Sequence, residues 1–211
     1  MVKIAVPSTL QQSIVQIGIL LVQSVINSFG STAIAGYSAG MRIESLSIVP
    51  MLAMGNAMST FTAQNMGAGK IDRVKEGYRM CYVIVLTAGA VLCIMYQLAG
   101  GAFVSLFLDS GSSEAYSVGL SYVKFLSFFY SFIGLKASTD GLLRGAGDVT
   151  AFTVANLVNL AIRVSVTNLF APIYGIQVAW MAVPLGWAAN YVISFGWYLT
   201  GKWKKVRVIK K

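Results

Sequence analysis

Histidine is absent from this sequence, and charged residues of any kind are scarce. Without histidine, a zinc site or a histidine-based catalytic triad is nearly excluded. Asp, Glu, Lys and Arg make up 11% of the 211 residues, against about 25% in a soluble domain. The two cysteines, Cys81 and Cys93, share one apolar segment and cannot pair within a single helix, so we interpret them as small apolar filler.

Other catalytic signatures are missing as well. The sequence has no Gly-x-Ser-x-Gly motif and no paired aspartates in the middle of an apolar segment. The run GAGK at 67–70 is not a nucleotide-binding loop, because Gln64 and Ile71 stand where that loop needs glycine and Ser or Thr. We therefore expect neither an enzyme nor a bound cofactor.

Apolar residues dominate what remains. They make up 56% of the chain, and the mean hydropathy is +0.71. A core of this size cannot absorb so much apolar surface, and lipid is the natural solvent for the rest. We predict an all-α, polytopic membrane protein with one six-helix lobe over residues 1–201 and a basic tail at 202–211. The predicted spans are 5–28, 32–63, 77–99, 116–140, 150–171 and 177–200. The second is longer than a bilayer requires, and Pro50 is expected to interrupt and kink it.

The basic residues predict the orientation. The net charge of +9 would suit a nucleic-acid partner, but the charges lie in short segments between apolar runs, as membrane-flanking charges do. Twelve of the 16 Lys and Arg residues lie before the first predicted span, after the second span, after the fourth span or in the tail. The loops on the opposite side contain no Lys or Arg. We therefore expect a multi-pass protein of the inner (plasma) membrane with both termini in the cytoplasm, and no nucleic-acid partner.

Six charges are left inside the predicted spans: Arg42, Glu44, Lys124, Lys136, Asp140 and Arg163. Charge in a bilayer is costly, so these side chains should face protein or water and find partners. Glu44 is the only acid near the middle of a span, which makes it the first candidate to carry a proton or another cation. Lys136 and Asp140 are four residues apart and can pair, so Asp140 is either a second carrier or half of a structural ion pair. Arg42 and Glu44 point to different faces of their helix.

Amides and aromatic rings complete the candidate binding surface. Gln23, Asn27, Asn156 and Asn159 are candidates to line a cavity, where they would coordinate Na⁺ or hydrogen-bond a substrate. The aromatic residues of 125–132 either stack on flat organic cations or face lipid and other helices. Gly36–Gly40 and Gly141–Gly145 have the spacing of helix-packing pairs, but 21 glycines make such pairs common by chance.

Two glycine motifs mark helix ends. In QNMGAGK, which contains Gln64 and Asn65, the residues Gly67 and Gly69 are expected to let a long helix end in a sharp turn. In LRGAGD, Arg144 and Asp148 bracket a tight turn at Gly145–Gly147 and are expected to attach it to neighbouring helix ends.

These motifs carry a family resemblance. The segment at 42–78, RIESLSIVPMLAMGNAMSTFTAQNMGAGKIDRVKEGY, resembles the second helix and following cytoplasmic loop of a half of a multidrug and toxic compound extrusion (MATE) transporter. DGLLRGAGDVTAF at 140–152 is similar to the family's junction of the tenth and eleventh helices, and KIAVPSTLQQSI at 3–14 to the start of the seventh. The resemblance implies the C-terminal lobe of a transporter with twelve helices, which exports small organic cations and drugs in exchange for Na⁺ or H⁺ through a cavity between its lobes.

The chain departs from some members of the family. Its first span has no acid, and Asp140 lies only four residues before Arg144, so the sodium site of those members does not carry over; the equivalent position is near Ile133. Other members carry the coupling acid in the N-terminal lobe. A lone lobe would also expose its cavity wall to lipid, so we expect a missing N-terminal lobe or a homodimer partner. The alternatives are a flippase for lipid-linked oligosaccharides, to which the intramembrane basic residues would be suited, and a non-transporting half-size subunit.

Overall fold

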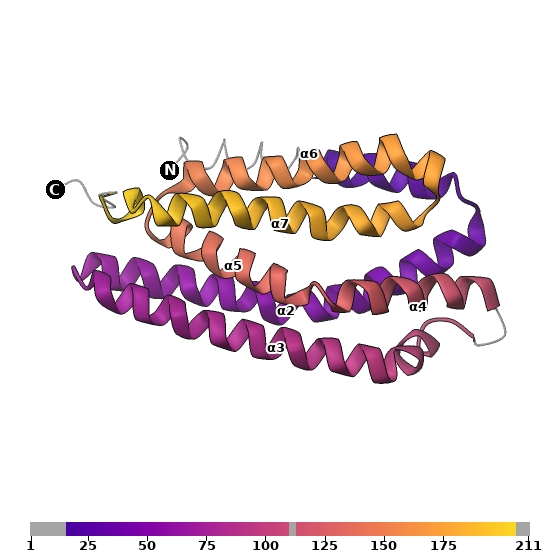
Figure 1. Ribbon diagram of the computed structural model, residues 1–211, viewed down its shortest axis with the longest axis horizontal. Helices are drawn as coiled ribbons and strands as arrows, with labels where there is room; N and C mark the ends of the chain where they lie inside the picture. Colours follow the sequence, from indigo (N-terminus) through magenta and orange to yellow (C-terminus); the bar gives the residue numbers. More distant parts are fainter. Residues whose placement is uncertain (1–15, 110–112, 206–211) are drawn as a thin grey trace.

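The computed structural model describes residues 16–109 and 113–205, and throughout these ranges the regular structure is helical (Figure 1). Lys3, the first part of the span predicted at 5–28 and the end of the basic tail lie outside the described residues. The helices are Gln16–Asn27, α2 Ser31–Gly67, α3 Ile71–Ser105, α4 Ser113–Ser127, α5 Tyr130–Gly145, α6 Val149–Tyr174, α7 Gln177–Leu199 and the short η1 Lys202–Lys205.

Four of these helices, α2, α3, α6 and α7, are long and apolar enough to cross a membrane, and α4 with α5 adds a fifth if the pair is counted as one span. α2, α6 and α7 begin and end within four residues of a predicted span, whereas α3 extends six residues beyond its predicted span at each end. The helix Gln16–Asn27 is a shorter apolar helix within the described residues. The protein is therefore an all-α, polytopic membrane protein, as the composition predicts.

The prediction of one continuous helix at 116–140 is wrong, because two helices occupy this range. α4 ends at Ser127 and α5 begins at Tyr130, with a bend of 53° between them. At the break, Phe129 N bonds Leu126 O at 2.8 Å, and Ser127 Oγ bonds Lys124 O at 2.7 Å. Gln97 of α3 donates to Lys124 O and to Ser127 Oγ, both at 2.8 Å. These bonds satisfy the polar groups that the break releases, which is the condition for irregular backbone at membrane depth.

The interruption predicted at Pro50 is also wrong, because α2 continues through this residue as one helix of 37 residues. Proline removes one backbone donor, and membrane helices tolerate this when neighbouring groups cover the freed carbonyl. The long second span is therefore a single element that reaches from one end of the molecule to the other (Figure 1).

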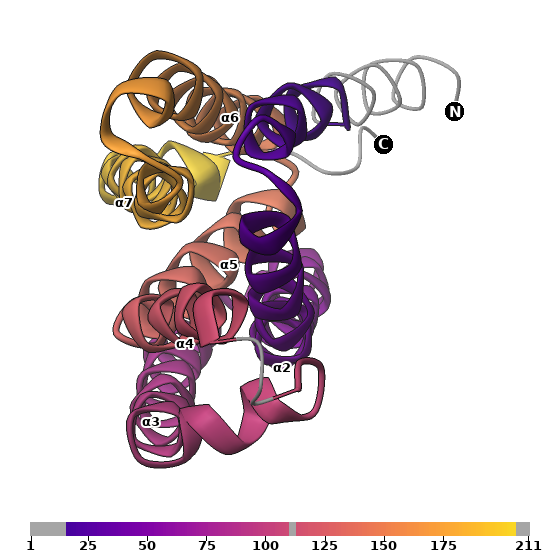
Figure 2. The same ribbon diagram turned by 90° about the vertical axis from the view of Figure 1, so that its right-hand side faces the viewer.

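The helices form two groups joined by α5. Figure 2 shows α6 and α7 on one side, beside the helix Gln16–Asn27, and α2, α3 and α4 on the other, with α5 between them. α5 packs on α2 and α3 and also on α7, so it contacts both groups. A residue on α5 can therefore reach side chains from either group.

Glycines on α2 allow close contact with both halves of the broken span. A Cβ on Gly36 or Gly40 would overlap α4, at Val118 and at the Tyr122 ring respectively. Farther along α2, Gly55 faces the Ala137 carbonyl of α5, and Gly141 of α5 faces the Gly55 carbonyl. The two glycine pairs that the sequence left undecided are thus packing surfaces, on which small residues let backbones approach closely.

The basic segments gather at one end. The α2–α3 turn, the α5–α6 turn and the end of α7 lie together at the left of Figure 1, and the turns that precede α2 and that join α6 to α7 lie at the right. Lys70 and Arg73 lie at the start of α3, Arg144 lies in the last turn of α5, and Lys202 begins η1, directly after α7. The fold therefore sorts the basic loops to one side, as the charge pattern predicts.

We expect Gly141→Ala to destabilise the protein by about 1–3 kcal/mol, because the added methyl group overlaps the Gly55 carbonyl oxygen in a contact between two backbones. Thermal unfolding in detergent measures the effect. Gly196→Ala is the matched control, since that glycine is in the interior of α7 with no atom near its missing Cβ. Equal melting temperatures for both variants would contradict the packing role of Gly141.

Candidate substrate and ion site

Glu44 lies on α2 and accepts a hydrogen bond from the Tyr122 hydroxyl of α4. Tyr122 is only 1% exposed, and its ring is pressed against Gly40. It meets the Tyr37 ring edge-on at 5.2 Å and the Trp180 ring of α7 at 5.6 Å. The carboxylate predicted as the ion carrier is thus held by an aromatic cluster contributed by three helices, which fixes its position.

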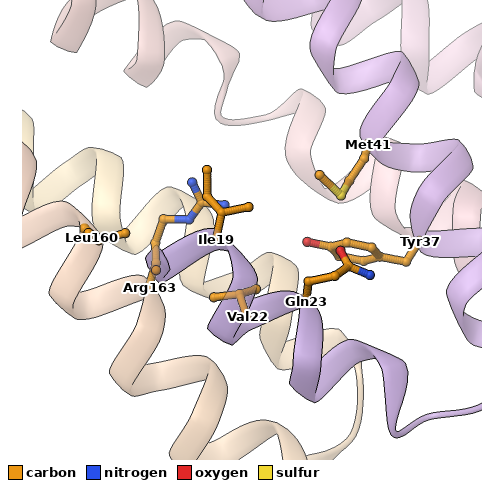
Figure 3. A pocket seen from close by; sticks show the side chains of 8 residues that line it. Ile19, Val22, Gln23, Tyr37, Met41, Leu160 and Arg163 are labelled. Carbon is orange, nitrogen blue, oxygen red and sulfur yellow. The ribbon is translucent and has the colours of Figure 1, made fainter. Parts of the chain in front are cut away.

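Arg163 of α6 lines a pocket together with Tyr37, a member of this aromatic cluster. Its charge acts electrostatically on Glu44 and on Tyr37, although the two charged groups form no salt bridge within the described part of the chain. Figure 3 shows Arg163 and Tyr37 facing each other across a narrow pocket between α6, α2 and the helix Gln16–Asn27. The other lining residues are Gly18, Ile19, Val22, Gln23, Met41 and Leu160.

A second buried polar cluster surrounds Asp140 of α5. The predicted ion pair is present, with Lys136 Nζ 3.2 Å from Asp140 Oδ2 and both side chains largely buried. Ser194 of α7 donates to Asp140 Oδ1 at 2.6 Å, and Asn156 of α6 donates to Oδ2 at 3.4 Å. Lys136 also donates to Asn156 Oδ1 at 3.0 Å. Since its carboxylate is matched by a lysine and two neutral donors, Asp140 has the surroundings of a structural ion pair.

The remaining sequence candidates lie apart from these two clusters. Arg42 is exposed on α2, 5.9 Å from the centre of the Phe107 ring, and does not pair with Glu44. Gln23 donates to Asn27 at 3.0 Å, and of the two only Gln23 lines the pocket. The side-chain amide oxygen of Asn159, Oδ1, is buried against Gly186 of α7. It has no hydrogen-bond partner among the described residues. The predicted site residues are therefore divided among several places and do not form one cavity.

The first glycine motif ends α2 largely as predicted. Gly69 has φ 71° and turns the chain, while Ala68 N bonds Gln64 O and Lys70 N bonds Asn65 O. The Asn65 side chain bonds Phe61 O at 2.8 Å within the helix. Gly67 does not take part in the turn as predicted, because it is the last helical residue and has no positive φ. A single left-handed glycine is enough to end a helix.

The second motif attaches the α5–α6 turn to two other helices. Arg144 donates to Asn56 Oδ1 of α2 at 2.8 Å, and Trp197 Nε1 of α7 donates to Asp148 Oδ2 at 2.7 Å. Asp148 also caps α6 by accepting from Ala151 N, and Gly147 supplies the positive φ of the turn. Gly145 ends α5 against the Ser59 carbonyl of α2.

The aromatic residues at the break between α4 and α5 form an apolar groove. Phe125, Phe129 and Phe132 contact one another in sequence, with ring centres 5.1 and 6.2 Å apart. They face Met181, Pro184, Leu185 and Ala188 of α7 across an open pocket with almost no polar surface. Such a surface suits a flat apolar molecule, and the rings can also attract a cation.

Several residues of the site were missed from the sequence. Asn190 and Ser194 are buried on α7 and hydrogen-bonded to each other, and their four-residue spacing in an apolar span was a readable signal. Tyr37, Tyr122 and Trp180 gave no such signal, because aromatic residues are common throughout the chain. Within the described residues no group of three or more Asp, Glu or Cys side chains comes together as a metal site.

Comparison with known proteins agrees with this architecture. The sequence profile of the MatE family matches residues 7–170. The chain belongs to the MatE family. The probable multidrug resistance protein YpnP of Bacillus subtilis is 28% identical over 207 residues, which are 98% of this MatE chain and 46% of YpnP. The probable multidrug resistance protein NorM of Thermotoga maritima is 21% identical, and the matched region is 99% of this chain and 45% of NorM.

Solved structures share the fold. The outward-facing conformation of a multidrug resistance MATE family transporter of the MOP superfamily superimposes with a TM-score of 0.85 at 17% identity, over 98% of this chain and 46% of that one. The MatE chain therefore spans about half the length of the relatives it matches, in sequence and in structure alike.

We expect Asp140→Asn to lower the free energy of unfolding by about 3–5 kcal/mol, because it leaves the buried Lys136 ammonium without its counter-charge. The double variant Lys136→Gln/Asp140→Asn should recover a large part of this loss, since both charges are then removed. Thermal unfolding of the three proteins in one detergent gives the comparison. Additive losses in the double variant would show that the two charges do not stabilise each other.

Proposed function

We propose that this MatE chain is the C-terminal lobe of a secondary active transporter that exports organic cations and drugs in exchange for entering Na⁺ or H⁺. The observation that carries the proposal is the Glu44 carboxylate, fixed on α2 by the Tyr122 hydroxyl. The multidrug resistance proteins among its relatives support the same direction.

Exchange follows from the chemistry of a carboxylate inside a membrane. An unneutralised charge is costly inside a membrane. Glu44 should therefore bind a proton, Na⁺ or the cationic group of a substrate. A site that holds one cation at a time releases the first when the second binds. If the cavity opens alternately to each side of the membrane, this competition links export of one cation to entry of the other.

The arrangement also suggests a second lobe. Members of repeat-built transporters place their binding site between two bundles of helices. The exposed Phe128 and Met181 and the open groove beside Pro184 leave this lobe with an uncovered apolar face. We propose that either the rest of a longer chain or a second copy covers it, in the plasma membrane with the basic end of the lobe in the cytoplasm.

We expect Glu44→Gln to abolish coupled transport while leaving folding and membrane insertion intact, since glutamine can still bond Tyr122 and can neither bind nor release a proton. Proteoliposomes with an imposed proton or sodium gradient and a fluorescent organic cation measure the coupling. Glu114→Gln is a matched control, because that acid lies in the first turn of α4. Full gradient-driven export by Glu44→Gln would remove the carrier role from this residue.

We expect the native membranes to contain a product of about twice the calculated 22.6 kDa of this chain, because the matched region is 46% of YpnP. An immunoblot with an antibody against the basic tail measures the mass. A product near 22.6 kDa would instead require a second chain, and cross-linking in the same membranes would then have to yield a dimer.

A further inference from the structure

The short helix η1 is fixed against the end of α7 by a buried tryptophan. The Trp203 ring is 0% exposed and stacks on the Tyr198 ring of α7 with ring centres 5.6 Å apart, and its Nε1 donates to Tyr198 O at 3.0 Å. Tyr198 packs in turn on the Tyr78 ring of α3, at 4.7 Å. Gly201 has φ 68° and turns the chain between α7 and η1. The residues on either side of Trp203 therefore have defined positions.

Two exposed lysines flank this tryptophan. Lys202 Nζ lies 5.2 Å from the centre of the Trp197 ring, and Lys204 Nζ lies 5.7 Å from the centre of the Trp203 ring. Within 16–109 and 113–205, neither lysine forms a salt bridge. Lys204 interacts with Asp72 of α3 at longer range, but that carboxylate is already paired with another lysine. Both ammonium groups can therefore pair with an additional anion.

The surroundings of η1 are also basic. The segments 70–79, 144–148 and 202–205 contain eight Lys and Arg residues and three Asp and Glu residues. They belong to the α2–α3 turn with the start of α3, to the α5–α6 turn and to η1, which lie at the same end of the molecule (Figure 1). Of the three acids, Asp72 forms a salt bridge and Asp148 accepts two hydrogen bonds. The excess of positive charge gives this end a potential that attracts anions.

The position of η1 favours an anion that is attached to an apolar body. Leu199 is the last residue of α7, is 66% exposed and lies three residues before Lys202. α7 is apolar enough to cross a membrane, so its exposed apolar side chains contact lipid. Three residues span about 5 Å along a helix, which places the lysines at the depth of the lipid headgroups. Tryptophan is enriched at the same depth, and Trp197 and Trp203 lie here.

We propose that η1 and the end of α7 form a binding surface for anionic phospholipids, in which Lys202 and Lys204 pair with the phosphate groups and Leu199 contacts the acyl chains. This goes beyond the charge pattern that predicts orientation, because it assigns the contact to two lysines held by Trp203. It does not depend on the proposed transport function. Ammonium and phosphate groups form charge-assisted hydrogen bonds, and each lysine near an anionic membrane surface strengthens binding by about fivefold.

The test compares two lipids that differ only in the headgroup. The purified natural protein that contains this lobe is kept in a neutral detergent and titrated with dioctanoyl phosphatidylglycerol or with dioctanoyl phosphatidylcholine. The rise in melting temperature with lipid concentration gives the dissociation constant of each lipid. Wild type should bind phosphatidylglycerol more tightly than phosphatidylcholine. The double variant Lys202→Gln/Lys204→Gln should weaken binding of phosphatidylglycerol by about thirtyfold and leave binding of phosphatidylcholine nearly unchanged.

Two single variants separate this surface from a general effect of charge. Arg42→Gln removes an exposed cation beside Phe107, which follows the end of α3 away from the basic turns, and should leave the lipid preference unchanged. Trp203→Leu keeps both lysines but removes the stacking and the hydrogen bond that fix η1, so it should lose a large part of the preference. The melting temperature of each variant without lipid is its own baseline, so a less stable variant still reports its preference.

Three results would overturn the proposal. The first is equal binding of the two lipids by wild type. The second is a preference that Trp203→Leu leaves intact or that Arg42→Gln lowers as much as Lys204→Gln does, because the charge would then act without the fixed surface. The third is loss of the preference when inorganic phosphate is present at the concentration of the lipid, since the lysines would then bind a free anion and not a lipid headgroup.

Discussion

The close approach of α2 to α4 and α5 is the contact on which the other features depend. Gly36 and Gly40 admit α4, and Gly55 admits α5, so one long helix holds both halves of the broken span. This spacing places the Tyr122 ring against α2, where its hydroxyl reaches Glu44. Between lipid-exposed helices there is no hydrophobic driving force, so such backbone contacts supply much of the association. The glycines therefore determine the geometry of the site as well as the packing.

Under the proposed function, the two polar clusters have different roles, the Asp140 cluster in stability and the Glu44 cluster in transport. Asp140 is surrounded by Lys136, Asn156 and Ser194, and a carboxylate with that many donors has little capacity left for another cation. Glu44 has one hydroxyl donor and an arginine at longer range. The acid with fewer partners is the one that can exchange them. Sequence position alone does not make this distinction, because both residues are acids within apolar segments.

Much of the fold could be predicted from the sequence, since the helical class and the positions of the long spans follow from apolar length and from loop charge. The Lys136–Asp140 pair was predictable because both members lie on one helix face. The break at Ser127 was not, because it depends on Gln97, a residue of a different helix. The same reason applies to the site: Tyr37, Tyr122 and Trp180 meet only after α2, α4 and α7 have packed, and no local pattern marks them.

The polar face of α5 has a consequence for how the protein enters its membrane. A nascent segment is inserted into the membrane according to its own apolarity. A lysine and an aspartate in the segment both lower that apolarity. α5 has only 16 residues, and it passes as a span only together with α4 despite the 53° bend. The ion pair lies within α5, but the asparagine and serine that donate to Asp140 belong to α6 and α7, which are synthesised later. The polar groups of α5 therefore gain their full set of partners only once α6 and α7 have packed against it, so the stability of this segment in the membrane depends on helices that follow it in the chain.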